Sequence, residues 1–335
     1  MNTVKRPSTS SAAKVARPDS TSRERAAAEE VMMEVTIVGS FLPASWGILT
    51  ARMAPSPDAE ETLTAFDGLK LHVETFDATA PMRAAVVMIH GFSAHCGLFR
   101  HVPAALARAG FAVTAFDCRG HGRSEGRHGY VKRFSDYADD LGRVIARARE
   151  RSPGLPLAVA AHSQGVAVTL DYLFRGVGTF DALVAAAPYL DLKMKVPLYK
   201  RMISPVLGVL WPTLTMSNEI ELDLSCSNPE ACAAMAADPL IRHVATPRWF
   251  NEVRATQARL RASPTALKVP TFMPVAGNDR LVDSDAAIAF AKAAGPIVDL
   301  KVYEKLFHEL YLETDRDVVI ADVVDWLRRR FAATA

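Results

Sequence analysis

Short apolar runs alternate with amphipathic stretches of helical length along the chain from about residue 60 onward. The runs are rich in Val, Ile and Ala, which is typical of buried strands, and we expect strands at Leu71–Phe76, Ala84–His90, Ala112–Asp117, Leu157–His162, Ala182–Ala187, Thr271–Ala276 and Val298–Tyr303. The amphipathic stretches predict helices at Val102–Ala109, Asp136–Arg149, Gly165–Phe174, Asp285–Ala293 and Val318–Arg330. Such alternation favours a mostly parallel central sheet with helices on both faces. The pattern therefore predicts an α/β fold.

Residues 189–265 interrupt this alternation. They contain several prolines, no buried-strand pattern and an apolar run that carries methionines from Met202 to Met216. We expect these residues to form a helical cap, or lid, over the carboxyl end of the sheet. The core would then consist of residues 61–188 and 266–335.

The N-terminal part of the chain differs from the rest in composition. Residues 1–28 carry six Lys or Arg and two acidic residues, with no aromatic side chain, so we expect residues 1–30 to be a disordered basic tail. Residues 31–60 form an extension of unknown role. Within it, residues 35–51 are uncharged but too interrupted by Gly and Pro for a spanning helix of about 20 residues. This segment either packs on the domain or makes a peripheral membrane contact.

Composition and charge exclude several classes of protein. The 335 residues are 50% hydrophobic and 23% charged with a net charge of +2, and the excess of basic residues lies in the tail, so nucleic acid is not an expected partner. The four cysteines form neither a C-x-x-C pair nor a cluster with zinc spacing, and we expect no metal and no cofactor. Without a secretory signal pattern, we expect a cytoplasmic protein, with peripheral membrane association through the cap or residues 35–51 as the alternative.

The segment A-H-S-Q-G at residues 161–165 is the first candidate for chemistry. It lies where a buried-strand pattern passes directly into a helix pattern, which is the context of a nucleophile elbow. Ala161 and Gly165 are small enough to let strand and helix pass closely, although the usual motif begins with Gly. The pattern predicts Ser163 as a nucleophile. Because the motif is only five residues long, an ordinary strand–helix turn is the alternative interpretation.

A serine nucleophile needs a base within hydrogen-bond reach and a third group that orients the base. Asp279 follows the strand expected at residues 271–276, and His308 follows the strand expected at residues 298–303. The chain order Ser, Asp, His is the order found in α/β-hydrolases. We therefore predict Asp279 as the acid and His308 as the base, with Asp283 or Asp285 as alternative acids.

Attack on a carbonyl also needs donors for the developing oxyanion. The strand expected at residues 84–90 ends in H-G-F-S, where Gly91 allows the backbone to turn. We predict the backbone N–H groups of Phe92 and Gln164 as the oxyanion hole and expect His90 to hold the loop. In the loop of residues 117–126, His121 either fixes the loop or contacts substrate.

Together these motifs resemble the α/β-hydrolase fold and, within it, the monoacylglycerol lipase and lysophospholipase-like serine hydrolases. The resemblance covers about residues 62–332 and includes the H-G-F loop, D-C-R-G-H-G-R-S-E-G, A-H-S-Q-G, D-P-L in the cap, G-N-D-R-L-V-D and L-F-H-E-L. The nucleophile, acid and base of that family fall on Ser163, Asp279 and His308. The chain departs from it at Ala94 and Leu98, where its monoacylglycerol lipases have Glu and Arg, so the alcohol group of the substrate is left open.

This resemblance implies a metal-independent carboxylic-ester hydrolase with an acyl-enzyme intermediate, acting on lipid-type esters such as monoacylglycerols or lysophospholipids. Thioesterase, amidase or peptidase, and lactonase activity stay open because a triad does not name the leaving group, and a non-catalytic membrane-associated binding module is a remote alternative. The apolar cap residues line an acyl pocket, touch lipid or form cap core. The residues expected to contact substrate are His95, His121, Tyr189, Leu207, Leu210, Trp211, Leu214 and Tyr311. The sequence does not indicate an oligomeric state.

Overall fold

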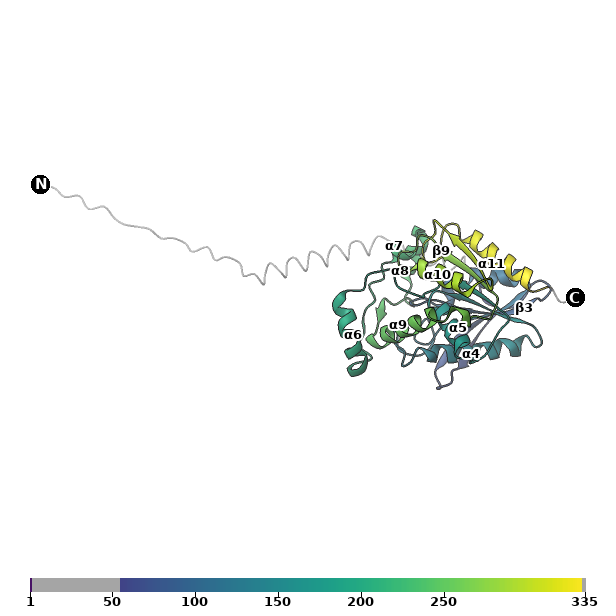
Figure 1. Cartoon of the computed structure of the whole chain (residues 1–335), viewed down its shortest axis with the longest axis horizontal. Coiled ribbons are helices and arrows are strands. Elements are labelled where there is room, and N and C mark those ends of the chain that lie inside the picture. The colour runs from purple at the N-terminus through teal and green to yellow at the C-terminus, as the bar shows by residue number, and fades with distance from the viewer. Residues whose placement is uncertain (2–54, 333–335) are drawn as a thin grey trace. The chain divides into compact units, whose positions relative to one another are not determined.

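The computed structural model describes Met1 and residues 55–332, and its centre is an eight-stranded sheet (Figure 1). The strand order is β1-β2-β4-β3-β5-β6-β9-β10. β1 pairs antiparallel with β2 and β2 with β4, and the other pairs are parallel. The strands are β1 (Ala59–Thr64), β2 (Lys70–Phe76), β3 (Ala84–Ile89), β4 (Phe111–Phe116), β5 (Leu157–His162), β6 (Ala182–Ala186), β9 (Thr271–Ala276) and β10 (Val298–Tyr303). The predicted mostly parallel α/β sheet is confirmed.

β1 is the strand of the central sheet that the sequence pattern did not predict. Its sequence AEETLT is mostly polar, and its side chains are mostly exposed. The strand lies at the edge of the sheet, where it needs no apolar run because its backbone hydrogen bonds to β2 hold it. Hydropathy alone therefore gave no signal for it.

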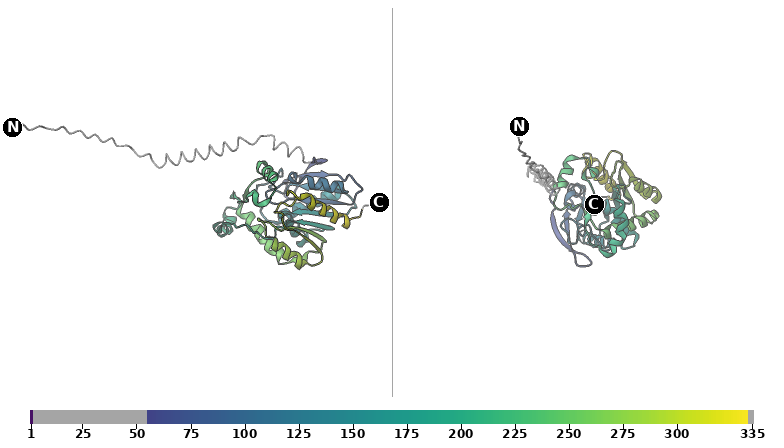
Figure 2. Two further views of the ribbon diagram at one scale, coloured as in Figure 1. Left: turned by 90° about the horizontal axis from the view of Figure 1, so that it is seen from above. Right: turned by 90° about the vertical axis from the view of Figure 1, so that its left-hand side faces the viewer.

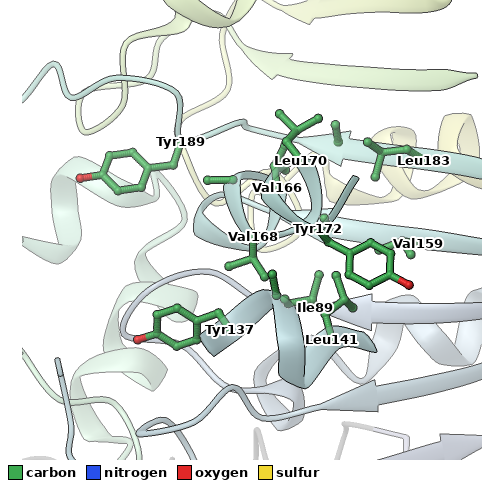
Figure 3. Packing of buried hydrophobic residues seen from close by; sticks show 14 of the residues in the cluster. Ile89, Tyr137, Leu141, Val159, Val166, Val168, Leu170, Tyr172, Leu183 and Tyr189 are labelled. Carbon is green, nitrogen blue, oxygen red and sulfur yellow. The ribbon is translucent and has the colours of Figure 1, made fainter. Parts of the chain in front are cut away.

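Helices cover both faces of the sheet (Figure 1). The side chains of β3 alternate between two apolar clusters, with Val87 and Ile89 in one cluster and Val86 and Met88 in the other. The first cluster also contains residues of α4 (Ser135–Arg151), α5 (Gln164–Phe174) and α10 (Ser284–Ala294). The second contains residues of α3 (His101–Arg108) and α11 (Arg316–Arg330), next to the short 3-10 helix η1 (Cys96–Phe99). The first-cluster packing is seen in Figure 3, where side chains of α4 and α5 lie against the strands.

Residues 189–265, called the cap from here on, follow β6 and end within the short 3-10 helix η2 (Pro264–Ala266), which precedes β9. The cap contains two two-residue strands that pair antiparallel with each other, away from the central sheet. Figure 1 shows α6 at the outer end of the cap, and the left view of Figure 2 shows the same helix protruding from the domain. The elements of the cap are α6 (Leu198–Leu210), β7 (Met216–Ser217), α7 (Leu222–Ser225), α8 (Pro229–Ala237), β8 (Val244–Ala245) and α9 (Pro247–Arg261).

Among the helices that the structure describes, none combines the length and the apolar character needed to cross a membrane. The expected basic tail and the uncharged segment 35–51 lie outside the described residues. Their proposed disorder and membrane contact stay predictions.

Candidate active site

Ser163 occupies the sharp turn between β5 and α5. Its φ of 52° and ψ of −117° are sparsely populated for a residue with a side chain, as a nucleophile elbow requires. The neighbouring glycines make this turn possible. A Cβ on Gly165 would lie 2.8 Å from the carbonyl oxygens of His90 and Ile89, and a Cβ on Gly91 would lie 2.9 Å from the Ser163 Cβ. The strand, the helix and the loop after β3 therefore approach each other too closely for larger residues.

Ser163, His308 and Asp279 form one chain of hydrogen bonds. The Ser163 Oγ lies 2.8 Å from His308 Nε2, and His308 Nδ1 lies 2.6 Å from Asp279 Oδ2. The carboxylate can only accept, so Nδ1 carries the proton and the free lone pair of Nε2 faces the serine hydroxyl. All three side chains are buried. This arrangement activates a serine for attack on a carbonyl.

The loop after β9 decides which of the three aspartates contacts the histidine. The second oxygen of Asp279 accepts the backbone N–H groups of Leu281 and Val282, at 2.9 and 2.8 Å, which fixes the carboxylate toward His308. Asp283 instead caps the N-terminus of α10 by accepting backbone N–H groups of that helix, and Asp285 lies in the first turn of the same helix. Asp279 is therefore the one of these three aspartates that contacts His308, and its role as the acid stays a prediction.

The charges of the triad stabilise each other. Burial by itself lowers the pKa of His308, but the charge of Asp279 and its hydrogen bond outweigh burial and hold this pKa above its ordinary value. Burial likewise raises the pKa of Asp279, and the opposing contributions of His308 and the two backbone N–H groups bring this pKa below its ordinary value. Asp279 is therefore ionised, and an imidazolium that forms during proton transfer is stabilised.

The backbone N–H groups of Phe92 and Gln164, expected to form an oxyanion hole, lie in the loop after β3 and at the start of α5, and their role stays a prediction. Gln164 begins α5, where a backbone N–H has no partner within the helix. Neither N–H donates a hydrogen bond to another of the described residues. His90 shapes the loop: its Nε2 accepts the Cys118 N–H at 2.9 Å, so its Nδ1 donates to the Gly91 carbonyl at 2.7 Å. Burial lowers the pKa of His90, which keeps this imidazole neutral.

Side chains of the site line two neighbouring cavities. The catalytic cavity contains Ser163 and His308, and the cap cavity lies below α6. Both are lined mostly by apolar side chains. They share the lining residues Phe92, Tyr189, Leu192, Met194, Ile220 and Trp249.

Of the residues expected to contact substrate, Tyr189 lines both cavities and Leu207 lines the cap cavity. The other six line neither of these two cavities. Leu210 and Trp211 are exposed to solvent at 78% and 58%, at the end of α6. Leu214 follows them, half-buried, in the loop that leads to β7.

The other three residues of that set are buried outside the two cavities. His95 bonds Asp238 of the cap at 2.9 Å, which links the oxyanion loop to the cap. The His121 ring contacts the Phe92 ring, with the two centroids 5.5 Å apart and the ring planes at 75° to each other. Tyr311 packs against Phe99 and the ring of the histidine before the nucleophile. In the structure each of these three side chains contacts protein groups, and their role as substrate contacts stays a prediction.

Two residues of the site were not singled out from the sequence. Trp249 lines both cavities, and only its place two residues after the Thr246–Pro247 helix start could have drawn attention to it. Glu309 lines the catalytic cavity next to His308, within the L-F-H-E-L motif. Burial raises the pKa of Glu309 to about 7, and its Oε2 has no hydrogen-bond partner among the described residues.

Three groups of described side chains lie close enough together to hold a metal ion, and one of them is His162, His308 and Glu309. Both ring nitrogens of His308 already bond Asp279 and Ser163. A cation at this place would have to displace one of these two bonds. The triad and the metal group are therefore mutually exclusive uses of the same histidine.

Residues 80–315 match the model of a family described as "Serine aminopeptidase, S33". The chain belongs to this family. Solved structures similar to this S33 family chain have the same fold, which confirms the expected α/β-hydrolase fold.

Individual relatives of this S33 family chain cover most of its length. It is 29% identical to a monoacylglycerol lipase of Mycolicibacterium smegmatis over 279 residues, which are 82% of this chain and 99% of that protein. It is 27% identical to the phospholipase YtpA of Bacillus subtilis over 248 residues, 73% of this chain and 95% of that protein. Its fold matches a soluble variant of monoglyceride lipase from Saccharomyces cerevisiae, solved with a substrate analog, with a TM-score of 0.74 at 21% identity over 84% of this chain and 97% of that one. The resemblance seen in the sequence motifs is confirmed.

Proposed function

We propose that this protein hydrolyses carboxylic esters of lipid type, such as monoacylglycerols or lysophospholipids, through an acyl-enzyme on Ser163. The observation that carries this proposal is the hydrogen-bonded chain Ser163–His308–Asp279 at the wall of a largely apolar cavity. The relatives named as a monoacylglycerol lipase and a phospholipase support the class of substrate.

In the proposed reaction, His308 Nε2 takes the proton of Ser163 as the hydroxyl attacks the ester carbonyl. The oxyanion is stabilised by the N–H groups of Phe92 and Gln164, and His308 then gives the proton to the leaving alcohol. Asp279 orients the imidazole and stabilises its charged form. Water, activated by the same histidine, releases the acid and restores the serine. Oxyanion donors of this kind contribute about 3 to 4 kcal/mol each to transition-state stabilisation.

The two cavities divide the substrate between them. The cap cavity offers an apolar lining for an acyl chain, with Leu207, Ile203 and Phe250 among its walls. In the catalytic cavity, Ala94 and Leu98 give the place near the nucleophile an apolar surface. The leaving alcohol then meets the polar side chains that remain in this lining, which are Ser93, Ser225, His243 and Glu309.

The family's description raises peptide cleavage at a free amino end as the second candidate. Such a substrate presents an ammonium group, which needs a carboxylate close to the nucleophile. Among the described residues that line the catalytic cavity, Glu309 is the one carboxylic acid, and its pKa of about 7 leaves it only partly ionised at neutral pH. Ester hydrolysis therefore fits the site better.

A substrate series tests the proposed function. We expect turnover of p-nitrophenyl esters and monoacylglycerols to peak at medium or long acyl chains, because the cap cavity buries more apolar surface with each added CH₂, about 0.8 kcal/mol apiece. Rates are measured spectrophotometrically and by fatty-acid release, beside a lysophospholipid, an acyl thioester and an aminoacyl p-nitroanilide. A higher kcat/KM on the anilide or the thioester than on every oxygen ester would contradict lipid-ester hydrolysis.

We further propose peripheral membrane contact through α6, which presents large apolar side chains to solvent. Leu210 is 78% exposed, and Met202 and Val209 are each 70% exposed. Exposed apolar patches of this kind mark interaction surfaces, and a surface above the cap cavity would let a lipid enter it directly. The exposed apolar residues of this face are Leu198, Tyr199, Met202, Ile203, Val206, Val209, Leu210 and Trp211.

The double substitution Met202→Glu and Leu210→Glu is expected to lower the fraction bound to phosphatidylcholine vesicles at least about tenfold, because two charges then replace apolar side chains at the lipid boundary. Co-sedimentation measures the binding, and turnover of water-soluble p-nitrophenyl butyrate should be unchanged. Val318→Glu is the matched control, since Val318 is 55% exposed on α11. Equal vesicle binding by wild type and the double variant would end the α6 proposal.

A further inference from the structure

One cap residue contacts both residues of the proposed oxyanion hole. The indole Nε1–H of Trp249 donates to the side-chain oxygen of Gln164 at 2.9 Å. The indole ring stacks on the Phe92 ring, with centroids 3.9 Å apart and an interplanar angle of 21°. We propose that Trp249 is a positioning residue: through these two contacts the cap aligns the two oxyanion donors. This inference rests on the proposed function, because it assigns Phe92 and Gln164 to oxyanion binding.

The two donors come from separate parts of the chain, so something must set their relative position. Phe92 lies in the loop after β3, and Gln164 begins α5. Preorganised donors stabilise a transition state because they need no rearrangement when charge develops. A single side chain that bonds one donor residue and stacks on the other gives the pair a fixed spacing. Trp249 is the residue with both contacts among those the structure describes.

Trp249 is itself held firmly. Its side chain is 5% exposed, and its backbone N–H donates to the Thr246 hydroxyl that caps α9. The Thr246 N–H and hydroxyl both bond the carbonyl of Gly129, at 2.9 and 2.8 Å, which ties the start of α9 to a core loop. The position of the indole is thus fixed from the core.

Phe92 also contacts His121. The His121 ring meets it edge-on at 5.5 Å and also lies 5.5 Å from the His90 ring, which shapes the oxyanion loop. Burial lowers the pKa of His121 to about 3, so this imidazole stays neutral. Phe92 is therefore held by contacts with both an indole and a neutral imidazole, and loss of the indole removes the stacked contact of the two.

A role as a wall and a role in positioning predict different kinetics. Trp249 lines both cavities, so a wall role affects long acyl chains, through KM and the chain-length profile. The oxyanion hole acts on every ester, so a positioning role lowers kcat on p-nitrophenyl acetate as much as on long-chain esters. The acetate rate separates the two.

Trp249→Phe keeps an aromatic ring for Phe92 and removes the Nε1–H donor. We expect kcat to fall about tenfold on both p-nitrophenyl acetate and a long-chain ester, with KM changed less than about twofold, since misaligned donors lose part of the 10²- to 10³-fold contribution of one donor. Gln164→Met removes the acceptor of the same bond but keeps the backbone N–H, and we expect the same loss. The double variant should be no worse than either single variant, because both remove one interaction.

Trp326→Phe is the matched control. Trp326 lies on α11, and its Nε1–H donates to Asp299 of β10 at 2.6 Å, so the same substitution removes the same kind of bond away from the site. Its kcat should equal that of wild type. Thermal unfolding of each variant shows whether it folds. If Trp249→Phe does not fold, Gln164→Met still tests the hydrogen bond between the two side chains.

The outcomes are distinct. Unchanged kcat on acetate in a folded Trp249→Phe variant, with altered KM for long chains, would overturn the positioning role and leave Trp249 as a wall. Additive losses in the double variant would overturn the Trp249–Gln164 bond as the cause. Absence of ester turnover in wild type would overturn the proposed function and this inference with it, whereas normal wild-type turnover with unaffected variants overturns this inference alone.

Discussion

Ser163→Ala is expected to lower kcat on every ester by about 10³- to 10⁶-fold, because removal of one member disables the whole Ser–His–Asp unit. The substitution deletes one hydroxyl whose partner is His308 Nε2 at 2.8 Å. The backbone conformation of the elbow is set by the close approach of its neighbours and should persist. Steady-state rates on the best ester of the substrate series, beside the unfolding temperature of both proteins, give the measurement.

A covalent probe that reacts with active-site serines adds an independent readout to the Ser163→Ala experiment. A fluorophosphonate should label wild type and leave Ser163→Ala unlabelled, because the hydroxyl is the atom that reacts. Wild-type turnover by a folded Ser163→Ala variant would show that another group is the nucleophile. Labelling of wild type without turnover of any ester would keep the nucleophile and reject the ester class.

Asp279→Asn is expected to lower kcat by about 10⁴-fold, the loss measured for the equivalent change in a serine protease triad. The amide would no longer accept the His308 Nδ1–H as a charged partner, so the imidazole loses both its orientation and its counter-charge. Asp283→Asn is the matched control: Asp283 caps α10, and its loss should cost stability of about 1 kcal/mol or less with turnover near that of wild type. Equal losses from both folded variants would remove the basis for choosing Asp279.

Asp279→Asn should also shift the pH profile of kcat/KM. His308 must be neutral to accept the serine proton, and Asp279 raises the pKa of His308. The acid limb of kcat/KM reports this pKa in the free enzyme. Without the carboxylate the pKa falls, so the acid limb of the residual activity of Asp279→Asn should lie at lower pH than that of wild type. A limb that stays in place would mean that another group titrates.

Much of the fold could be predicted because its signals are local. The seven strands expected from apolar runs agree with the structure to within one residue at each end. A buried strand must be apolar along its length, and that requirement is visible in the sequence itself. β1 was not predicted, because an exposed edge strand need not be apolar along its length.

The positions of Ser163, Asp279 and His308 show what can be predicted from the order of residues and strands along the chain. Parallel strands bring their carboxyl ends to one edge of the sheet, so residues after β5, β9 and β10 were expected to meet, and Ser163, Asp279 and His308 do lie together. Their catalytic roles stay predictions until the variants are measured. The structure was needed to see that Asp279 and not Asp283 contacts His308, because both follow the same strand and the sequence does not show that Asp283 caps α10.

The sequence by itself determined the strand and helix pattern, the elbow and the loops that carry Asp279 and His308, since each depends on residues that are neighbours in the chain. Only the tertiary structure decided which side chains line the cavities, and it placed Tyr189 and Leu207 there but Leu210 and Trp211 in solvent. It also brought Trp249 to the oxyanion loop. The physical reason is that a side chain's surroundings are made by segments distant in sequence, whose contacts depend on how the cap packs and not on the pattern within any one segment.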